Sequence, residues 1–373
     1  MAEFHPFCRA VSRRTFSRNL LSRDLFSRGL LLSRGLLAGG ALLLASPLLA
    51  PHAAVAQQVV NVYTTREPGL AAPLFEAFTK ATGIEVKSVY IKDGLAERVK
   101  AEGASSPADV LMTVDVGNLL DVVDAGITQP VTSPALTAAV PANLRDPDGN
   151  WYALSLRARL IYTAKDVVKL SAITYEDLAD PKWKGKICIR SGQHPYNVGL
   201  VAAYLVHHGE AKTEAWLRGV KANLARKAAG GDREGARDIL GGICDLAVGN
   251  SYYVGLMRSG KGGPDQKKWG DGIGVLLPTF QGGGTHVNVS GAAVAKNAPH
   301  KAEAVKLLEF AVSPAMQAVY AQQNLEYPVL ATATIDPVIA DLGPLKVDTI
   351  SLVDIAKNRK HASELIDKVG FDN

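Results

Sequence analysis

The segment VVNVYTTREPGLAAPLFEAFTKATGIEVKSVYI, residues 59–91, reads as a strand, a helix and a second strand in immediate succession. Residues 59–65 are rich in β-branched side chains, as strands are. Residues 73–83 place apolar side chains at helical spacing and end at Gly83, because glycine commonly follows the last turn of a helix. Residues 84–91 are strand-like again. This succession predicts parallel strands joined by a right-handed crossover.

The alternation continues beyond this unit. Residues 94–103 and 116–126 are predicted helices on either side of a strand at residues 108–114. The chain then runs through a β-rich stretch at residues 149–166, which is longer than a strand of one sheet needs. We expect this stretch to pass between two lobes.

A second run of alternating elements follows residue 166. Its predicted strands and helices are 186–191, 196–208, 211–225, 233–240, 244–250, 252–260, 274–280 and 286–296, followed by a helix pair at 301–312 and 313–324. The Gly- and Lys-rich segment 260–272 is predicted to be a surface loop. Strands that alternate with helices in this way predict the α/β class.

The first 56 residues have the composition of an export signal. The basic segment SRRTFSR (12–18) precedes an apolar run at residues 36–50, and small residues favour cleavage after Ala56. Arg13 and Arg14 suggest the twin-arginine route, with the ordinary secretion route as the alternative. A membrane anchor is disfavoured because the run has about 15 residues, and a span needs about 20.

The leader also accounts for the net charge. It contains seven of the 41 basic residues and two of the 36 acidic ones, which leaves 34 of each in the remaining 317 residues. A neutral mature chain lacks the basic character that nucleic acids or anionic membranes attract. Its length is too great for one small core and favours two lobes.

Two cysteines remain after removal of the leader, which takes Cys8 with it. Cys188 and Cys244 are an even number in an exported chain, so a disulfide is predicted, with two buried free thiols as the alternative. Each cysteine lies in a predicted strand, and a tyrosine follows eight residues later, Tyr196 in one case and Tyr252 in the other.

The tyrosines fall where helices are predicted to begin. Tyr252 and Tyr253 would point to opposite faces of a strand, but in the first turn of a helix both can lean toward one point. Phenolate is a hard anionic oxygen donor that suits Fe(III), and three phenolates would neutralise a trivalent cation. The alternative is that Tyr196, Tyr252 and Tyr253 are partly buried tyrosines with hydrogen-bonded hydroxyls.

Motifs for other chemistry fail on inspection. The segment GLMRSGKG (255–262) resembles a phosphate loop, but Gly262 stands where Ser or Thr is required. The sequence contains no G-x-S-x-G nucleophile elbow and no H-E-x-x-H zinc motif. We therefore expect a protein that is not an enzyme.

Several strings, taken together, carry a family resemblance. They are VNVYTTREP, SPADVLMTVD, LRDPDGNWYALSLRARLIYT, DLADPKWKGKICIRSG, NLARKAAGGDRE, GNSYYVG, NVSGAAVAKNAPHKAEAVKLLEF and EYPV. With these strings the chain resembles the periplasmic ferric-ion-binding proteins of ABC iron-uptake systems, the bacterial counterparts of transferrin. The resemblance implies a type II periplasmic-binding-protein fold, with two α/β lobes and parallel-rich sheets joined by crossing strands.

The resemblance also implies lobe boundaries and ligands. Residues 58–157 with 279–330 would form an N-terminal lobe, and residues 158–278 with 331–373 a C-terminal lobe that carries the ligands. By position, the family's three iron-ligating tyrosines correspond to Tyr196, Tyr252 and Tyr253.

One branch of the family draws additional ligands from a His-Tyr pair in the first loop. This chain has Glu67-Pro68 there and is similar to the three-tyrosine branch, which has Arg-Gln-Pro and binds iron with a carbonate-type anion. Glu67 is either a fourth, carboxylate ligand or an exposed loop acid. Arg66 and Arg157 are the candidate anion-binding residues, since guanidinium groups suit a planar carbonate. Either arginine could instead form a structural ion pair, and Arg159 competes with Arg157.

The resulting prediction is a monomeric periplasmic protein that captures Fe(III) with carbonate or bicarbonate and delivers it to the permease of an ABC importer. It would contact the membrane only through that permease and would not bind nucleic acid. The alternative is the same fold binding a carboxylate or phosphate anion without metal.

Overall fold

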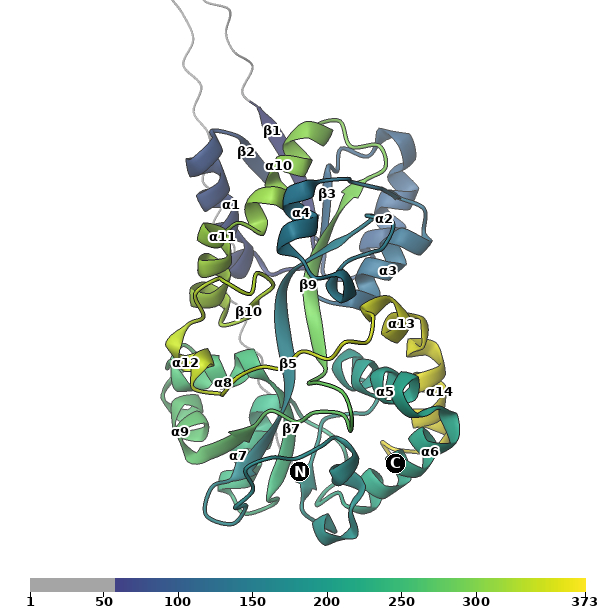
Figure 1. Ribbon diagram of the computed structural model, residues 1–373, viewed down its shortest axis with the longest axis vertical. Coiled ribbons are helices and arrows are strands. Elements are labelled where there is room, and N and C mark those ends of the chain that lie inside the picture. Colours follow the sequence, from purple (N-terminus) through teal and green to yellow (C-terminus); the bar gives the residue numbers. More distant parts are fainter. Residues whose placement is uncertain (1–57) are drawn as a thin grey trace, which may run out of the picture. The chain divides into compact units, whose positions relative to one another are not determined.

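The computed structural model describes residues 58–373 (Figure 1). The predicted export signal, residues 1–56, lies outside the described residues. None of the helices within residues 58–373 has both the length and the apolar character of a bilayer-spanning segment.

Ten strands and fourteen α-helices are described in this part of the chain. The strands are β1 (Val59–Thr64), β2 (Glu85–Tyr90), β3 (Val110–Thr113), β4 (Thr128–Gln129), β5 (Tyr152–Ala164), β6 (Ile187–Cys188), β7 (Leu246–Asn250), β8 (Ile273–Leu276), β9 (Val287–Ala295) and β10 (Tyr327–Pro328). The helices are α1 (Pro68–Thr82), α2 (Leu95–Glu102), α3 (Val116–Asp124), α4 (Pro134–Ala139), α5 (Pro195–His208), α6 (Glu210–Ala222), α7 (Asp232–Leu240), α8 (Ser251–Arg258), α9 (Pro264–Gly272), α10 (Lys301–Ala311), α11 (Pro314–Val319), α12 (Pro337–Ala340), α13 (Leu352–Lys357) and α14 (Arg359–Lys368).

Helix α1 illustrates how the sequence dictates its local structure. Pro68 occupies the first turn, where its missing N–H has no partner to lose. The buried residues Ala71, Leu74, Phe75 and Phe78 recur at the spacing of one helix face. Gly83 ends the helix with φ 75°, a left-handed conformation that favours glycine. Complete burial of a side chain such as Phe78 stabilises the fold by about 1.5–3 kcal/mol.

The strands follow the order β2-β1-β3-β9-β5-β7-β6, with β4 paired to β9 and with β8 and β10 paired to β5. The long strand β5 joins two groups of elements. Its residues 152–158 pair with β9, whereas residues 159–164 pair with β7 and β8. In Figure 1, β5 and β9 run through the centre, with α1–α4 and α10 above them and α5–α9 below.

The sheet as a whole is mixed: the predicted parallel pairing lies at its two ends, and the crossing strands β5 and β9 between them are antiparallel. Parallel pairing joins β1 to β2 and β3, and β6 to β7. Strands β5 and β9 are antiparallel to each other, and each is antiparallel to its other neighbours in the main order. The chain leaves the first group of elements through β5 and returns through β9, so these two strands must run in opposite directions.

The surface loop predicted at residues 260–272 is wrong, because most of this segment forms helix α9. Gly263 is the N-cap, and Pro264 provides a favourable first turn. Gly270 allows α9 to pack closely on α8, since a Cβ at Gly270 would lie 2.6 Å from Cβ of Met257. The helix depends on this tertiary contact, which a Gly- and Lys-rich composition does not reveal.

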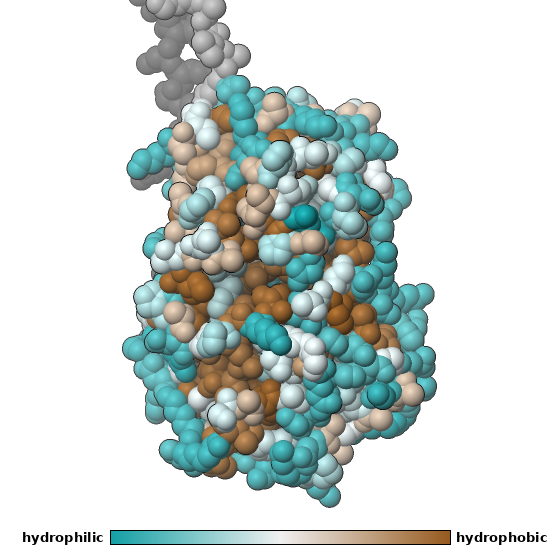
Figure 2. Space-filling model, viewed as in Figure 1, coloured by the Kyte–Doolittle hydropathy of each residue, from teal (hydrophilic) through white to brown (hydrophobic). Residues whose placement is uncertain are grey.

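Figure 2 shows hydrophobic residues gathered along the middle of one face, with hydrophilic residues predominating around its edge. Beneath the surface, a continuous apolar core includes residues of β1, β3, β5, β7 and β9 and of the helices packed on them. The crossing strands are buried almost throughout, which fixes the side chains that they direct toward the site.

Candidate functional site

Two helix N-termini position the predicted tyrosines. Helix α5 begins at Pro195, and the His194 Nδ1 atom accepts a hydrogen bond of 3.2 Å from the backbone N–H of Tyr196. Helix α8 begins immediately after β7, with Asn250 as N-cap, so Tyr252 and Tyr253 both lie in its first turn. The positive ends of two helix dipoles are thus close to the phenols and favour negative charge there.

The structure brings the three tyrosines together. The hydroxyl oxygens of Tyr196 and Tyr252 are 3.3 Å apart. The rings of Tyr252 and Tyr253 are stacked at a tilt, with centroids 4.1 Å apart. A cavity of about 370 Å³ lies beside them and is lined by Thr65, Arg66, Glu67, Leu70, Tyr90, Val114, Arg157, Tyr196, Arg233, Tyr252, Tyr253, Leu256, Asn324 and Glu326.

We call the side formed by Tyr196, Tyr252 and Tyr253 the tyrosine wall. We call the side formed by Arg66, Arg157, Asn324 and Glu326 the arginine wall.

Burial sets the protonation of the phenols. It raises the pKa of Tyr252 well above the ordinary value, and the phenols of Tyr196 and Tyr253 raise it further, whereas Arg157 lowers it. Burial raises the pKa of Tyr253 as well. Both phenols are therefore neutral at pH 7 in the free protein. A cation that binds them as phenolates must displace their protons.

A buried polar network that the sequence did not predict lies behind the tyrosine wall. The Arg159 guanidinium donates to Asp232 Oδ2 at 2.6 Å, to Asn250 Oδ1 at 3.0 Å and to Asn197 Oδ1 at 2.6 Å. Asn197 follows Tyr196 directly, and Asn250 precedes Tyr252 by two positions. One arginine therefore connects the starts of both tyrosine-bearing helices. Asn197 and Asn250, which lie close to the tyrosines in the sequence, were the signal from which this network could have been predicted.

Two additional guanidinium groups lie over the phenol rings. Arg190 is 5.3 Å from the ring centroid of Tyr196, and Arg233 is 5.3 Å from that of Tyr253. Arg190 is also paired with Asp232 at 3.3 Å. Positive charge at these positions would stabilise a phenolate more than a phenol.

On the arginine wall, Arg66 is committed to a buried ion pair. Its guanidinium donates to both carboxylate oxygens of Glu326, at 3.1 Å each, and to the hydroxyl of Ser290. The hydroxyl of Ser155 also donates to Glu326. These contacts favour the structural alternative for Arg66.

Arg157 lines the cavity, whereas its competitor Arg159 lies within the network behind the tyrosines. The Arg157 Nη2 atom donates to the backbone carbonyls of Val114 and Val289. Its Nε atom has no hydrogen-bond partner within residues 58–373. Glu67 also lines the cavity, as an exposed N-cap of α1 whose side chain makes no capping bond.

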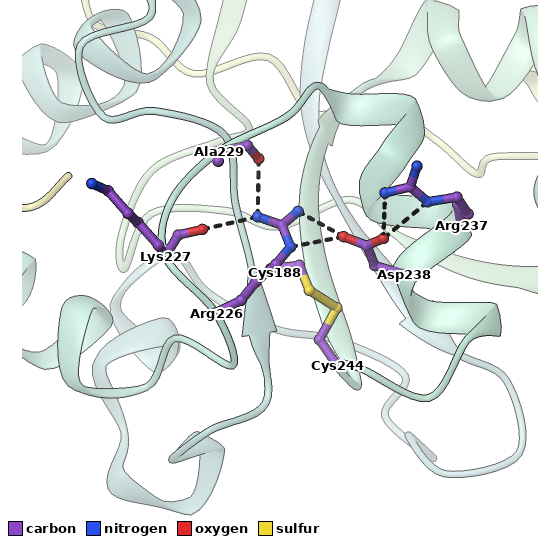
Figure 3. The surroundings of a disulfide bond; sticks show 7 residues. All are labelled: Cys188, Arg226, Lys227, Ala229, Arg237, Asp238 and Cys244. Atoms are coloured by element: carbon purple, nitrogen blue, oxygen red, sulfur yellow. Dashed lines mark hydrogen bonds and ion pairs between the residues drawn. A yellow bond between two sulfur atoms is a disulfide. The ribbon is translucent and has the colours of Figure 1, made fainter. Parts of the chain in front are cut away.

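The predicted cysteine pair forms a disulfide between Cys188 of β6 and Cys244, just before β7, with Cα atoms 5.8 Å apart (Figure 3). The ion pairs of Asp238 with Arg226 and Arg237 lie beside it. Since β6 leads through a loop to α5 and β7 continues directly into α8, the bond ties together the supports of the tyrosine wall.

Among residues 58–373, no group of three or more His, Cys, Asp and Glu side chains is arranged to hold a metal ion. The three phenols are consequently the best candidate donor set in the described part of the chain. Their hard oxygen chemistry suits a small, highly charged cation.

A family model described as bacterial extracellular solute-binding protein matches residues 105–346. The chain is 43% identical over 336 residues to iron uptake protein A1 of Synechocystis sp., and the match covers 88% of this chain and 93% of that protein. The solved structure of Bordetella ferric binding protein shares 64% identity with a TM-score of 0.82, covering 85% of this chain and 100% of that one. A Trichodesmium protein solved in complex with iron and citrate ligands shares 42% identity with a TM-score of 0.80, covering 84% and 99%.

The chain belongs to the bacterial extracellular solute-binding protein family. Within that class, its relatives confirm the predicted resemblance to ferric-ion-binding proteins and the predicted α/β fold of that group. The relatives are solute-binding proteins, in line with the expectation of a protein that is not an enzyme. The exact lobe boundaries and the roles of individual site residues stay predictions.

Proposed function

We propose that this protein binds Fe(III) in the periplasm through the phenolates of Tyr196, Tyr252 and Tyr253 and delivers it, as a monomer, to the permease of an ABC importer. The convergence of the phenols carries the proposal, above all the separation of 3.3 Å between the hydroxyl oxygens of Tyr196 and Tyr252. The relatives named for iron uptake and ferric binding support the choice of metal.

The separation of the phenol oxygens suits a shared ion. A small hard cation has metal–oxygen bonds of about 2 Å in octahedral geometry, so adjacent ligand oxygens lie about 2.8 Å apart. The phenol oxygens of Tyr196 and Tyr252 need to move by only about half an ångström to reach that spacing. Three phenolates would neutralise Fe(III).

A synergistic anion would complete the shell from the arginine wall. Arg157 is the favoured contact because it lines the cavity and donates to two backbone carbonyls, with no ion pair to a carboxylate among residues 58–373. Arg66 is less favoured because Glu326 and Ser290 already bond to both of its Nη atoms. Carbonate or bicarbonate is the proposed anion, and citrate, which accompanies iron in the Trichodesmium relative, is its competitor.

Glu67 has the weakest support of the candidate ligands. It lines the same cavity but is exposed and makes no capping bond. We assign it the role of a loop acid that attracts the cation to the mouth of the cavity.

The proposal is tested by titrating the iron-free protein with ferric citrate and following visible absorption. Iron phenolates absorb strongly through charge transfer, so the wild type should turn orange to red. Loss of an outer-shell partner costs metal sites about 10–100-fold in affinity, so loss of a direct ligand in Tyr252→Phe should cost more than about 100-fold.

Tyr204→Phe is the matched control, since Tyr204 lies on α5 and stacks on Trp216, outside the lining of the cavity. It should bind iron like the wild type. A colourless wild type, or a Tyr252→Phe variant that binds its ligand normally, would instead favour the metal-free anion alternative.

A further inference from the structure

We propose that the side-chain amide of Asn324 binds the anion that accompanies iron and selects for an anion with both an acceptor oxygen and a hydroxyl group. This inference rests on the proposed function and deepens it. Asn324 is only 3% exposed and lines the cavity beside the tyrosines. Neither its Oδ1 nor its Nδ2 atom has a hydrogen-bond partner within residues 58–373.

A buried amide without partners is costly, at about 1–3 kcal/mol for each unsatisfied group. Buried polar side chains in native proteins usually have partners, so an exception at a binding cavity points to a ligand. The neighbouring Glu326 differs in this respect, because Arg66 and Ser155 satisfy its carboxylate. Asn324 is thus the uncommitted amide of the arginine wall.

The backbone after Asn324 is held in an unusual conformation that fixes this amide. Leu325 has φ 56°, and within residues 58–373 it is the sole residue other than glycine with positive φ. Such conformations cost energy and persist where packing demands them. Leu325 is buried against Gly255 of α8, where an added Cβ would lie 2.8 Å from Cβ of Leu325. Lys261, just after α8, donates to the carbonyl of Gln322 at 2.8 Å.

The packing places the amide close to the metal ligands. Gly255 is three residues after Tyr252 on α8, so Leu325 rests against the helix that carries two of the phenols. A ligand held in this cavity would lie beside Asn324, which lines it together with the phenols.

The chemistry of the amide narrows the class of anion. An amide offers two donors on nitrogen and an acceptor on oxygen. Bicarbonate and citrate can satisfy both sides, since each has acceptor oxygens and a hydroxyl group. Oxalate as a dianion has acceptors only and would leave Oδ1 of Asn324 unpaired.

The test compares the wild type with Asn324→Leu, which keeps the branching at Cγ in a larger side chain and removes both polar groups. Iron-free protein with one equivalent of Fe(III) is titrated in carbonate-depleted buffer with bicarbonate, citrate or oxalate. The visible band gives the half-saturating anion concentration. Gln323→Ala is the matched control, because Gln323 is the exposed amide one position earlier.

The wild type should require less bicarbonate or citrate than oxalate for half-saturation. The separate titrations with bicarbonate and citrate show which of these two anions the protein prefers. Asn324→Leu should need about tenfold more of the preferred anion, as expected from the loss of one to two hydrogen bonds, and should no longer discriminate against oxalate. Gln323→Ala should match the wild type within about twofold.

Thermal unfolding of the iron-free proteins excludes a structural role. Because no group in residues 58–373 bonds to the amide, Asn324→Leu should have an unchanged or higher Tm without iron. A lower Tm, or an unchanged anion requirement, would overturn the inference but leave the proposed function intact. A wild type that gives no visible band with any anion would overturn the proposed function as well.

Discussion

Both walls of the cavity contain polar side chains, but the two walls differ in how these side chains are paired within the protein. On the arginine wall, Arg66 and Glu326 form a buried ion pair, and each also bonds to a serine, Ser290 or Ser155. On the tyrosine wall, the hydroxyls of Tyr196 and Tyr252 contact each other, and the supporting charges lie one layer behind.

The comparison teaches where a ligand can gain free energy. A group already paired within the protein must lose its partner before it binds anything else, whereas phenols that meet only each other are free to bind an ion. The network of Arg159 holds them in place without competing for their oxygens.

The largest effect is expected from breaking the ion pairs behind each wall. Arg66→Met leaves the buried carboxylate of Glu326 without an ion-pair partner and should lower the free energy of unfolding by about 3–5 kcal/mol. Arg159→Met leaves the buried carboxylate of Asp232 paired with Arg190 alone, so its loss should be smaller. Urea unfolding measures this loss. Arg159→Met alone should also shift the visible band of the iron complex, because only Arg159 bonds to the neighbours of the tyrosines.

Arg66→Met is the control for a general loss of stability. Equal spectral shifts in the two variants would contradict the inference that Arg159, and not Arg66, supports the tyrosines.

An effect of similar size is expected from the disulfide, which supports the tyrosine wall. The cysteines are 56 residues apart, so the chain-entropy relation predicts a loss of about 4 kcal/mol for the paired Cys188→Ala, Cys244→Ala variant. Denaturant unfolding with and without reductant checks this value. The variant should be insensitive to reductant, and a wild type that is equally insensitive would contradict the expectation.

Acid should lower the free energy of unfolding through protonation of His286. This residue adjoins the Arg159 network, since its backbone carbonyl accepts from the backbone N–H of Arg159 at 3.0 Å. Burial lowers the pKa of His286 from 6.5 to about 4; Asp348 opposes this shift, whereas Arg159 adds to it. Between these two values the unfolded chain binds the proton and the folded chain does not. Stability is therefore complete above pH 6.5, falls as the pH drops, and has lost about 3 kcal/mol near pH 4.

Urea unfolding between pH 7 and pH 4 measures this slope. His286→Leu should flatten it by that amount, and an unchanged slope would show that His286 does not titrate in this range.

The smallest effect is expected at Glu67, the exposed acid at the mouth of the cavity. An exposed charge contributes about 0–1 kcal/mol, so Glu67→Gln should weaken iron binding by no more than about fivefold. Iron competition with citrate measures the change. A loss above about 100-fold would identify Glu67 as a fourth ligand and move the metal toward the arginine wall.

Much of the local structure followed from residue type and spacing. The alternation of β-rich and helical segments predicted β1, α1, β2, α2, β3 and α3, because burial on one helix face and extended β-branched runs are local signals. The same holds for Ser313, whose hydroxyl accepts from the N–H of Met316 at the start of α11. The helix in segment 260–272 was not predicted, because α9 depends on contact with α8.

In the candidate site, too, local features could be predicted from the sequence, whereas contacts between distant segments could not. The residue types of Tyr196, Tyr252 and Tyr253, and their places at helix starts, were legible in the sequence because helix N-termini have local signatures. Their convergence was not, since it depends on how β6 and β7 pair and on the Arg159 network. The partners of Arg66 and the unpaired amide of Asn324 were equally hidden, because Glu326 lies 260 residues from Arg66.

The sequence by itself determined most of the strands and helices before residue 325, the α/β class and the donor chemistry, because these depend on neighbours along the chain. Only the tertiary structure decided which side chains are satisfied and which face the cavity. Hydrogen-bond satisfaction is a property of contacts between distant segments, and no local pattern encodes it.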